Sequence, residues 1–415
     1  MTTSDAQTAF VWTWLPGSAE PVVAGRVDAE GPLHAFTYAR SYRERRAAIP
    51  LYEPELPLTP GTQRPAGGLT IAGCLRDSGP DSWGQRVILA RHAGRLTNAS
   101  DVTELSLLTY LLESGSDRIG GLDFQASPTE YLPRTSSSAT LEQLMGAAAT
   151  IEAGGMLPSA LAEALTRGTS IGGARPKVLL ADAGRSLIAK FGSTTDIRPV
   201  VKAEGVAMEL ARRVGLNVAP AQVSSVAGKD VLLVERFDRP GGGQRRHLVS
   251  ALTILGLDEF TGARYGSYAL LADRIRQSFT EPAATLRELF SRIVFNVLVG
   301  NTDDHARNHA AFINADSSLT LTPAYDICPQ PRSVPQANQA MAIGRSGERS
   351  SRLATCLAAS EVYLLDTAQA QSIIGTQVDI IQAQWRDAAD AARLTELERK
   401  QLFRREILND FAFRD

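Results

Sequence analysis

The chain has 415 residues, of which 44% are hydrophobic and 21% are charged, and its formal net charge is −2. A chain of this length exceeds the size at which one hydrophobic core keeps growing, so we expect two or three compact units. The nearly neutral charge excludes a general basic field that would attract nucleic acid.

The N-terminal part of the sequence predicts a small antiparallel sheet followed by helices. Apolar and polar residues alternate over residues 9–15, 22–27 and 33–38, with turn residues between these segments. Residues 50–67 are rich in Pro and Gly and predict an extended loop, whereas residues 83–113 show helical periodicity. The four arginines within residues 40–46 are interpreted as a solvated surface rather than a phosphate contact.

Two further features concern location and metal chemistry. No apolar run has transmembrane length, and residues 1–10 lack the basic region and hydrophobic core of a signal peptide, so we expect a cytoplasmic protein without membrane contact. The three cysteines, Cys74, Cys328 and Cys356, are scattered, which excludes a disulfide framework and a cysteine-rich zinc site.

The next segment predicts a phosphate-binding loop and a strand that carries a lysine. A connector rich in Ser and Thr at residues 135–140 precedes a helix that begins near Leu141. Residues 168–177, GTSIGGARPK, then form a glycine-rich loop, and glycine permits close backbone approach to an anion. A glycine-rich hairpin without function is the alternative for this loop alone. Residues 186–191 predict a strand with Lys190, placed as a kinase lysine that reaches nucleotide phosphates.

A helix is predicted over residues 200–215, where the apolar pattern ends at Gly215. In kinases, a glutamate on the corresponding helix pairs with the strand lysine. Glu204 and Glu209 are both candidates for a pair with Lys190, and their spacing does not choose between them. An exposed helix charge is the alternative for either glutamate.

The second half of the sequence predicts a helical lobe with a catalytic segment inserted. The glycine-rich residues 240–243 mark the passage into this lobe, and helical patterns cover residues 285–299, 369–393 and 396–411. The inserted segment, residues 295–329, is FNVLVGNTDDHARNHAAFINADSSLTLTPAYDICP.

The inserted segment contains the side chains that phosphoryl transfer requires. One carboxylate must orient and deprotonate the attacking hydroxyl, while a second carboxylate and an amide hold magnesium against the phosphates. Asp303 is followed five residues later by Asn308, then by a strand at residues 310–313, a turn, and a second strand ending at Tyr325 and Asp326. Protein kinases show the same order. A simple polar turn is the alternative, but it would not require His305, Asn308 and Asp326 as well.

Three separated motifs together resemble the HipA family of bacterial serine/threonine kinases, the toxins of type II toxin–antitoxin modules. The motifs are SIGGARPK at residues 170–177, LIAKF before VVKAEGVAMELARRVGLNVAP, and NTDDHARNH with LTPAYD. VLLVERFDR at residues 231–239 resembles the family's hinge, and SGSDRIGGLDF at residues 114–124 resembles its N-terminal subdomain. The resemblance implies an α+β, bilobal protein-kinase-like fold with a β-rich N-terminal subdomain at 1–130, a small-lobe-like region at 131–240 and a mostly helical C-terminal lobe at 241–415.

The resemblance also implies roles for individual residues. Asp303 is the catalytic base with His305 beside it, Asn308 and Asp326 bind Mg²⁺, and Ser170 matches the loop serine that autophosphorylation modifies. Asp304 follows where relatives often have Gly, so both carboxylates remain candidates, with Asp303 favoured by its distance from Asn308. The residues expected to contact ATP are Ser170, Gly172, Gly173, Lys177, Lys190, Glu235, Phe237, His305, Asn308, Tyr325 and Asp326.

The function implied is that of an ATP-dependent protein serine/threonine kinase that acts as a toxin and is regulated by loop autophosphorylation. Its substrate would be a hydroxyl of a cytoplasmic protein, such as a translation factor of the aminoacyl-tRNA synthetase class. Its partner would be a HipB-like helix-turn-helix antitoxin, through which alone it would reach operator DNA. Two alternatives remain: a small-molecule kinase, because the acceptor cannot be read from these residues, and an inactive nucleotide-binding co-repressor.

Overall fold

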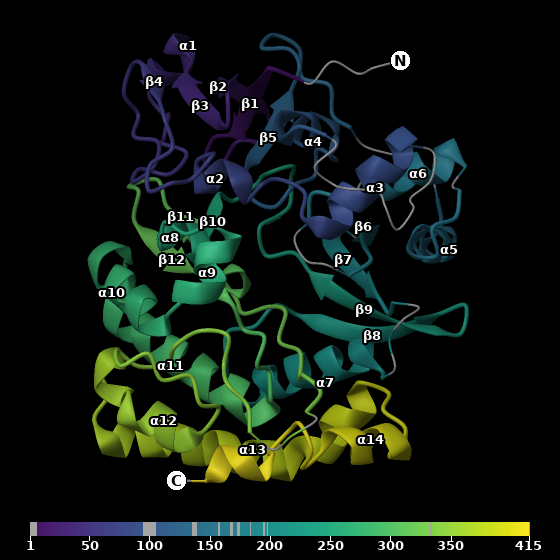
Figure 1. Cartoon of the computed structure of the whole chain (residues 1–415), viewed down its shortest axis with the longest axis vertical. Coiled ribbons are helices and arrows are strands. Elements are labelled where there is room, and N and C mark those ends of the chain that lie inside the picture. Colours follow the sequence, from purple (N-terminus) through teal and green to yellow (C-terminus); the bar gives the residue numbers. More distant parts are fainter. Residues whose placement is uncertain are drawn as a thin grey trace.

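The computed structural model of the chain has a β-rich N-terminal end and a helical C-terminal end, with a second sheet between them (Figure 1). The expected α+β class and two-lobed arrangement are therefore confirmed. The structure describes residues 6–93, 105–134, 139–156, 158–166, 169–171, 175–182, 184–193, 196, 198–332, 334 and 336–414.

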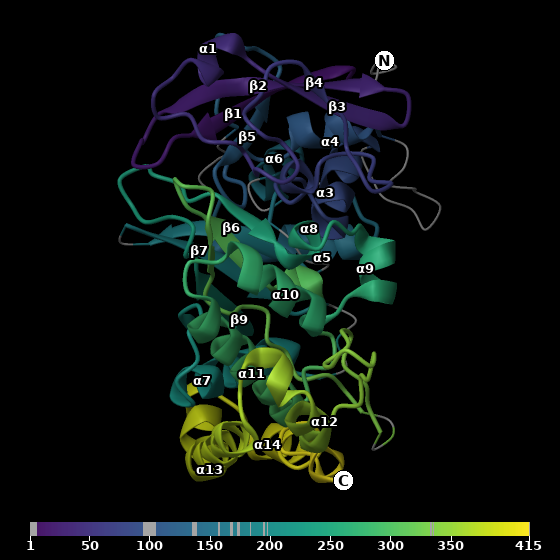
Figure 2. The ribbon, with the colours of Figure 1, turned by 90° about the vertical axis from the view of Figure 1, so that its left-hand side faces the viewer.

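The N-terminal unit is an antiparallel five-stranded sheet with strand order β4-β3-β2-β1-β5. The first three strands lie where alternation predicted them, and β5 returns from much later in the chain to pair with β1. Figure 2 shows this sheet across one end of the molecule. The strands are β1 Thr8–Trp14, β2 Pro21–Glu30, β3 Leu33–Tyr38, β4 Thr62–Gln63 and β5 Leu122–Gln125, and the short helices beside them are α1 Arg40–Arg43, α2 Gly73–Arg76 and α4 Leu107–Glu113.

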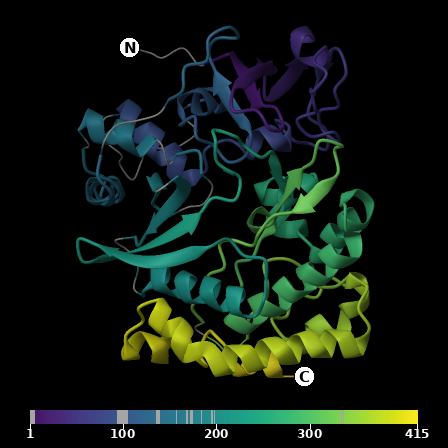
Figure 3. The ribbon, with the colours of Figure 1, turned by 180° about the vertical axis from the view of Figure 1, so that it is seen from behind.

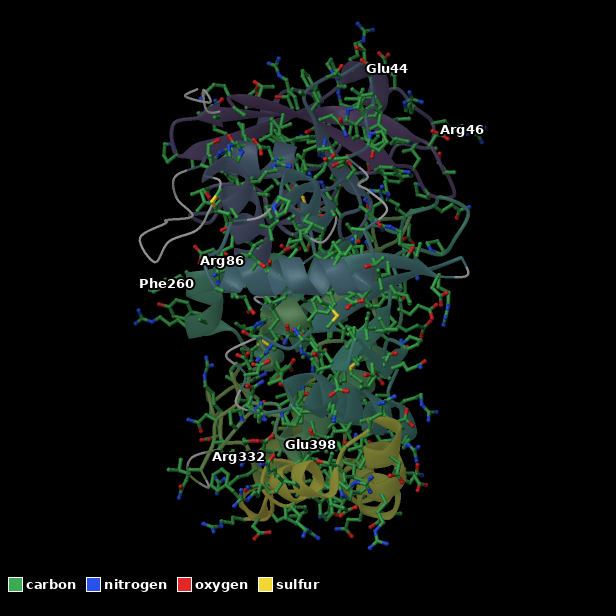
Figure 4. All side chains as sticks on the ribbon, turned by 90° about the vertical axis from the view of Figure 1, so that its right-hand side faces the viewer. Glu44, Arg46, Arg86, Phe260, Arg332 and Glu398 are labelled. Carbon is green, nitrogen blue, oxygen red and sulfur yellow. The ribbon has the colours of Figure 1, made fainter. Side chains whose placement is uncertain are left out.

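Three of the four arginines near α1 are exposed, as expected, whereas Arg43 is half-buried. Arg45 and Arg46 are exposed, and the Arg40 side chain pairs with Glu44 across one helical turn. Figure 4 shows Glu44 and Arg46 pointing outward at the N-terminal end of the molecule. Surface pairs of this kind contribute little to stability, so this cluster needs no ligand to explain it.

A second antiparallel sheet, with order β6-β7-β9-β8, forms the centre of the molecule. Its strands are β6 Lys177–Asp182, β7 Arg185–Phe191, β8 Ala221–Val226 and β9 Lys229–Glu235. Helix α7, Val200–Arg213, packs between this sheet and α13, Thr367–Ala391 (Figure 3). Gly205 permits the close approach, because a Cβ atom there would lie 2.3 Å from Val223 Cγ2.

Three helices cover the β6–β7 end of this sheet, and one of them comes from the N-terminal part of the chain. They are α3 Ser82–Ala93, α5 Leu141–Glu152 and α6 Ser159–Thr166. Trp83 of α3, Leu144 of α5 and Leu165 of α6 belong to one buried cluster with Val178 and Phe191 of the sheet. The predicted start of α5 near Leu141 is confirmed, and Thr140 and Gln143 form a capping box there. The connector predicted at residues 135–140 lies partly outside the described residues.

The C-terminal lobe is built around the buried helix α11, Pro282–Val299. Its last turn ends at Gly300, which has φ +70° and lies so close to Glu406 O that a Cβ atom would be 2.6 Å away. The other elements of this lobe are β10 Leu248–Ser250, α8 Ala251–Ile254, α9 Glu259–Tyr265, α10 Tyr268–Ser278, β11 Ala310–Ile313, β12 Leu319–Leu321, α12 Leu353–Ala358 and α14 Glu396–Leu402, with 3-10 turns at Ala306–Asn308, Ser360–Tyr363 and Asp410–Phe413.

Two predicted elements are shorter than expected. The strand predicted to end at Tyr325 and Asp326 ends at Leu321, because Ala324 pairs with Val218 in a parallel bridge outside the hairpin. The helix predicted over residues 396–411 stops at Leu402, because the chain turns through positive φ at Arg404 and Leu408. Among the described residues, no helix combines the length and apolarity needed to span a membrane.

Candidate active site

The predicted catalytic loop begins where α11 ends, and buried amides hold its shape. Asn301 donates its backbone N–H to Asn296 O at 2.9 Å and its side-chain Nδ2 to Asn296 Oδ1 at 3.0 Å. Asn296 in turn donates Nδ2 to Asp304 Oδ2 at 2.8 Å. Because these three side chains are buried and bonded to one another, the polar loop is a fixed structure rather than a solvated turn.

The two neighbouring aspartates of this loop have opposite environments. Asp304 is buried, and its carboxylate accepts hydrogen bonds from Tyr268 and Asn296 and lies 2.7 Å from His309 Nε2. Burial raises the pKa of Asp304, but the charge and hydrogen bond of His309 outweigh this effect and lower it overall. The Asp303 side chain is exposed, and burial of the loop together with the nearby carboxylates of Asp326 and Asp304 raises its pKa.

Lys190 joins the two lobes at the centre of the site. Its Nζ lies 2.6 Å from Glu204 Oε1 on α7 and 2.5 Å from Asp326 Oδ1 beyond β12. Burial lowers the pKa of Lys190, but the two carboxylates outweigh it and raise the pKa, while Lys190 lowers the pKa of Asp326. The choice between the two helix glutamates is thereby decided by geometry: Glu204 faces Lys190, whereas Glu209 pairs with Arg212 and Arg213 on the outer side of the helix.

Lys177 lies directly opposite Lys190 in the antiparallel β6–β7 pair. Residues opposite each other in such a pair project from the same face of the sheet, so both lysines face the site. The Lys177 side chain is buried, and burial lowers its pKa to about 8. Its Nζ lies 3.8 Å from Asp81 Oδ2, a carboxylate of the N-terminal part that sequence reasoning missed.

The described part of the glycine-rich loop packs against the N-terminal unit. Thr169 Oγ1 accepts a hydrogen bond from Gly115 N at 3.2 Å, and the Ser170 side chain is completely buried. Ser170 Oγ has no hydrogen-bond partner among the described residues. Gly172 and Gly173, both expected to contact ATP, lie outside the described residues.

The predicted hinge residues lie at the end of β9 and just beyond it. Phe237 packs its ring 5.7 Å from that of Tyr325 and 5.8 Å from that of Phe312. The Tyr325 hydroxyl donates to Arg307 O in the catalytic loop at 2.7 Å. Tyr325 therefore links the hinge to the loop. Glu235 is half-buried at the end of β9, and its Oε2 lies 4.0 Å from Arg185 Nη1.

Asn308 and Asp326 are the residues expected to hold a metal. Asn308 is buried, and its Nδ2 donates to Asp303 O at 3.5 Å, a bond that uses the nitrogen of the amide and not its oxygen. Amide and carboxylate oxygens suit Mg²⁺, which keeps waters and phosphates as its other ligands. Within the described part of the chain, no group of three or more His, Cys, Asp or Glu side chains could hold a metal by itself. His305, at the start of the 3-10 turn, is exposed.

A buried ionic cluster behind the hinge was also missed. Arg236 bonds to Asp238 and to Asp117 of the N-terminal part, and Arg239 bonds to the same two carboxylates. Asp238 also accepts from Gly120 N at 2.8 Å. The only sequence signal for this cluster was the coincidence of charged residues in the two segments RFDR and SGSDR.

The chain is similar in sequence to known proteins. The sequence profile of the HipA-like C-terminal domain matches residues 169–385. A putative kinase of Sinorhizobium fredii named Y4mE is 31% identical over 149 residues, which cover 34% of this chain and 33% of that protein. The serine/threonine-protein kinase toxin HipA of Shewanella oneidensis is 28% identical over 188 residues, which cover 38% of this chain and 42% of that protein. The matches thus span less than half the length of these curated relatives.

A solved structure is similar over nearly the whole chain. It belongs to the complex of HipA, HipB and operator DNA from Shewanella oneidensis MR-1, and the similarity has a TM-score of 0.63 at 20% sequence identity. The alignment covers 94% of this chain and 97% of the other. At this identity the comparison shows a shared fold, including the N-terminal sheet that lies outside the profile match.

Proposed function

The chain belongs to the HipA family, and we propose that it is an ATP-dependent kinase that phosphorylates a serine or threonine hydroxyl of a protein. The observation that carries this proposal is the position of Lys190 between Glu204 and Asp326. Protein kinases hold their phosphate-binding lysine with a helix glutamate and use a nearby aspartate as a magnesium ligand. A structural ion pair would need only one of these carboxylates, whereas phosphoryl transfer accounts for both.

The proposed nucleotide site lies between strand β7 of the central sheet and the segment after β12, where Lys190 meets Asp326. Lys190 and Lys177 would contact the phosphates, since both face the site from neighbouring strands. Glu235 and Phe237 would border the adenine at the end of β9. The other residues that we assign to the nucleotide are Ser170, Gly172, Gly173, His305, Asn308, Tyr325 and Asp326.

Asn308 and Asp326 would hold Mg²⁺, which when bound neutralises charge on the phosphates. The backbone of Asp326 supports an assigned role, because it adopts φ +59° although it is not glycine. Such strained conformations concentrate at functional sites, where the surrounding structure maintains them.

Asp303 is the better candidate for the base. Its exposed carboxylate can reach an incoming hydroxyl, and its raised pKa favours proton acceptance. Asp304 is buried and already occupied by Tyr268, Asn296 and His309, so we assign it to holding the loop.

Ser170 is proposed as the autophosphorylation site, with one condition that follows from its burial. Its side chain is fully buried, so the loop must leave its present position before Ser170 can accept a phosphate. A phosphate on Ser170 would add charge and acceptor oxygens that have no partners at the buried position. The modified loop would therefore stay displaced.

We further propose that the protein acts in the cytoplasm as the toxin of a type II module. The support is the name of the Shewanella relative and the fold shared with the complex of HipA, HipB and operator DNA. The partner would be a HipB-like helix-turn-helix antitoxin, and operator DNA would be reached through that partner. The substrate would be a cytoplasmic protein, such as an aminoacyl-tRNA synthetase.

Intact-mass spectrometry after incubation with Mg²⁺ and ATP tests the catalytic proposal. We expect one added phosphate on wild type, mapped to Ser170 by peptide analysis, and none on Asp303→Asn. A phosphate that also appears on Asp303→Asn would reject Asp303 as the base. ATP binding without any transfer to the protein or to added cytoplasmic proteins would favour a small-molecule kinase or a nucleotide-binding co-repressor.

A further inference from the structure

The start of helix α3 contacts both ends of the glycine-rich loop. At the beginning of the loop, Thr169 O lies so close to Gly84 that a Cβ atom there would be 1.9 Å away. At the end of the loop, Lys177 Nζ lies 3.8 Å from Asp81 Oδ2. Both contacts come from residues that precede the family profile match, which begins at residue 169.

Asp81 has a structural role that uses only one of its oxygens. It caps α3, since Gln85 N donates to Asp81 O at 2.8 Å and Gly84 N donates to Oδ1 at 3.4 Å. The other oxygen, Oδ2, has no hydrogen-bond partner among the described residues and is the atom that faces Lys177. A buried carboxylate oxygen without a hydrogen bond costs free energy. Helix capping by Oδ1 does not explain why Oδ2 is held toward Lys177.

The charges around this pair come from both lobes. Asp326, Glu204 and Lys190 act on Lys177 from the site, and Arg307 of the catalytic loop acts on Asp81. Lys177 is only 1% exposed, so water screens its charge little and neighbouring carboxylates control its position.

From this arrangement we infer that Asp81 is a positioning residue of the nucleotide site, which acts through Lys177 by holding its ammonium group where the ATP phosphates bind. The start of α3, which precedes the C-terminal kinase region in the chain, then contributes directly to the kinase site. Burial lowers the pKa of Lys177, and Asp81 counteracts this effect, so Asp81 also keeps the lysine charged. This inference rests on the proposed role of Lys177 in phosphate binding.

The test uses the full chain and measures dissociation constants for Mg²⁺–ATP and for adenosine by calorimetry at about pH 7.5. The variants are Asp81→Asn, Lys177→Met and the double variant, with Asp81→Ser as a second cap-forming change. Asn and Ser both cap helices well, so α3 should remain intact, and a melting curve checks this. Asp366→Asn is the matched control, because Asp366 caps α13 in the same way at a distance from the site.

We expect Asp81→Asn to weaken ATP binding about tenfold, a size typical of coupled neighbours, and to leave adenosine binding unchanged because adenosine has no phosphates. The double variant should bind ATP no more weakly than Lys177→Met alone. Asp366→Asn should behave as wild type.

Unchanged or tighter ATP binding by Asp81→Asn would overturn the inference, as would an equal loss for adenosine or additive losses in the double variant. If Lys177→Met binds ATP as wild type does, the assigned role of Lys177 in the proposed function fails, and the inference fails with it. Loss of ATP binding by Lys177→Met without any effect of Asp81→Asn removes only the inference.

Discussion

Lys190 and Glu204 form a buried ion pair with 2.6 Å between Nζ and Oε1, and this pair joins strand β7 to helix α7. The Glu204 side chain is only 5% exposed, so its orientation depends on protein neighbours rather than water. The position of α7 therefore determines where the lysine points.

Glu204→Gln should reduce phosphoryl transfer about 10- to 100-fold, because small displacements of a positioning group cost rates of this size. The amide keeps the volume of the side chain but loses the charge that balances Lys190. Glu209→Gln is the matched control on the same helix, since Glu209 bonds to Arg212 and Arg213 away from the site. The autophosphorylation rates of both variants are measured by intact mass. An equal loss of rate in both variants would assign the effect to the stability of α7 and not to the pair with Lys190.

Asp304→Asn should destabilise the protein by about 2–3 kcal/mol, because it disturbs a buried set of hydrogen bonds. Tyr268, Asn296 and His309 all contact the same oxygen, Oδ2, and a neutral amide oxygen in its place would accept these hydrogen bonds more weakly than the charged carboxylate does. Asp303→Asn should leave stability nearly unchanged, since the Asp303 side chain is exposed. Urea unfolding of the two variants measures the difference, and equal stabilities would contradict the separate roles of the two aspartates.

The affinity for Mg²⁺–ATP should fall as the pH rises through about 8. Burial lowers the pKa of Lys177 to about 8, and only its protonated form attracts phosphate. Affinity is therefore full below this pH and declines above it as the lysine becomes neutral. Calorimetry from about pH 7 to about pH 9.5 would show this decline in wild type, whereas Lys177→Met should lack it. A decline of the same size in Lys177→Met would assign the titration to another group.

Arg236→Met should destabilise the protein by about 3–5 kcal/mol, because it leaves Asp238 buried with one fewer cation. Burial alone raises the pKa of Asp238, but Arg236 and Arg239 outweigh it and lower the pKa in the folded state. This carboxylate therefore stabilises the fold above its unfolded-state pKa, and its contribution is lost as the pH falls. Arg212→Met is the control, since Arg212 is 62% exposed in its pair with Glu209 and should change stability by less than about 0.5 kcal/mol. Comparable losses of stability in Arg236→Met and Arg212→Met would contradict the stabilising role of the buried ionic cluster.

Local patterns in the sequence were sufficient for the individual elements. Alternation placed β1 to β3, the 3.6-residue period placed α7 and α11, and the polar run after α11 located the loop that we propose to be catalytic. These features depend on neighbours within a few residues, so the sequence displays them directly. The order of Lys190, Asp303, Asn308 and Asp326 along the chain also predicted which residues to seek in one site.

The tertiary structure alone decided which of these residues meet. Glu204 rather than Glu209 faces Lys190 because packing of α7 against the sheet sets the rotation of the helix. Asp81 reaches Lys177 across 96 positions of the sequence because α3 folds onto β6 and β7. The burial of Ser170 and the early end of β12 also depend on segments that are distant in the sequence. Contacts between segments far apart in the chain depend on how buried faces fit together, and no local period of the sequence records that fit.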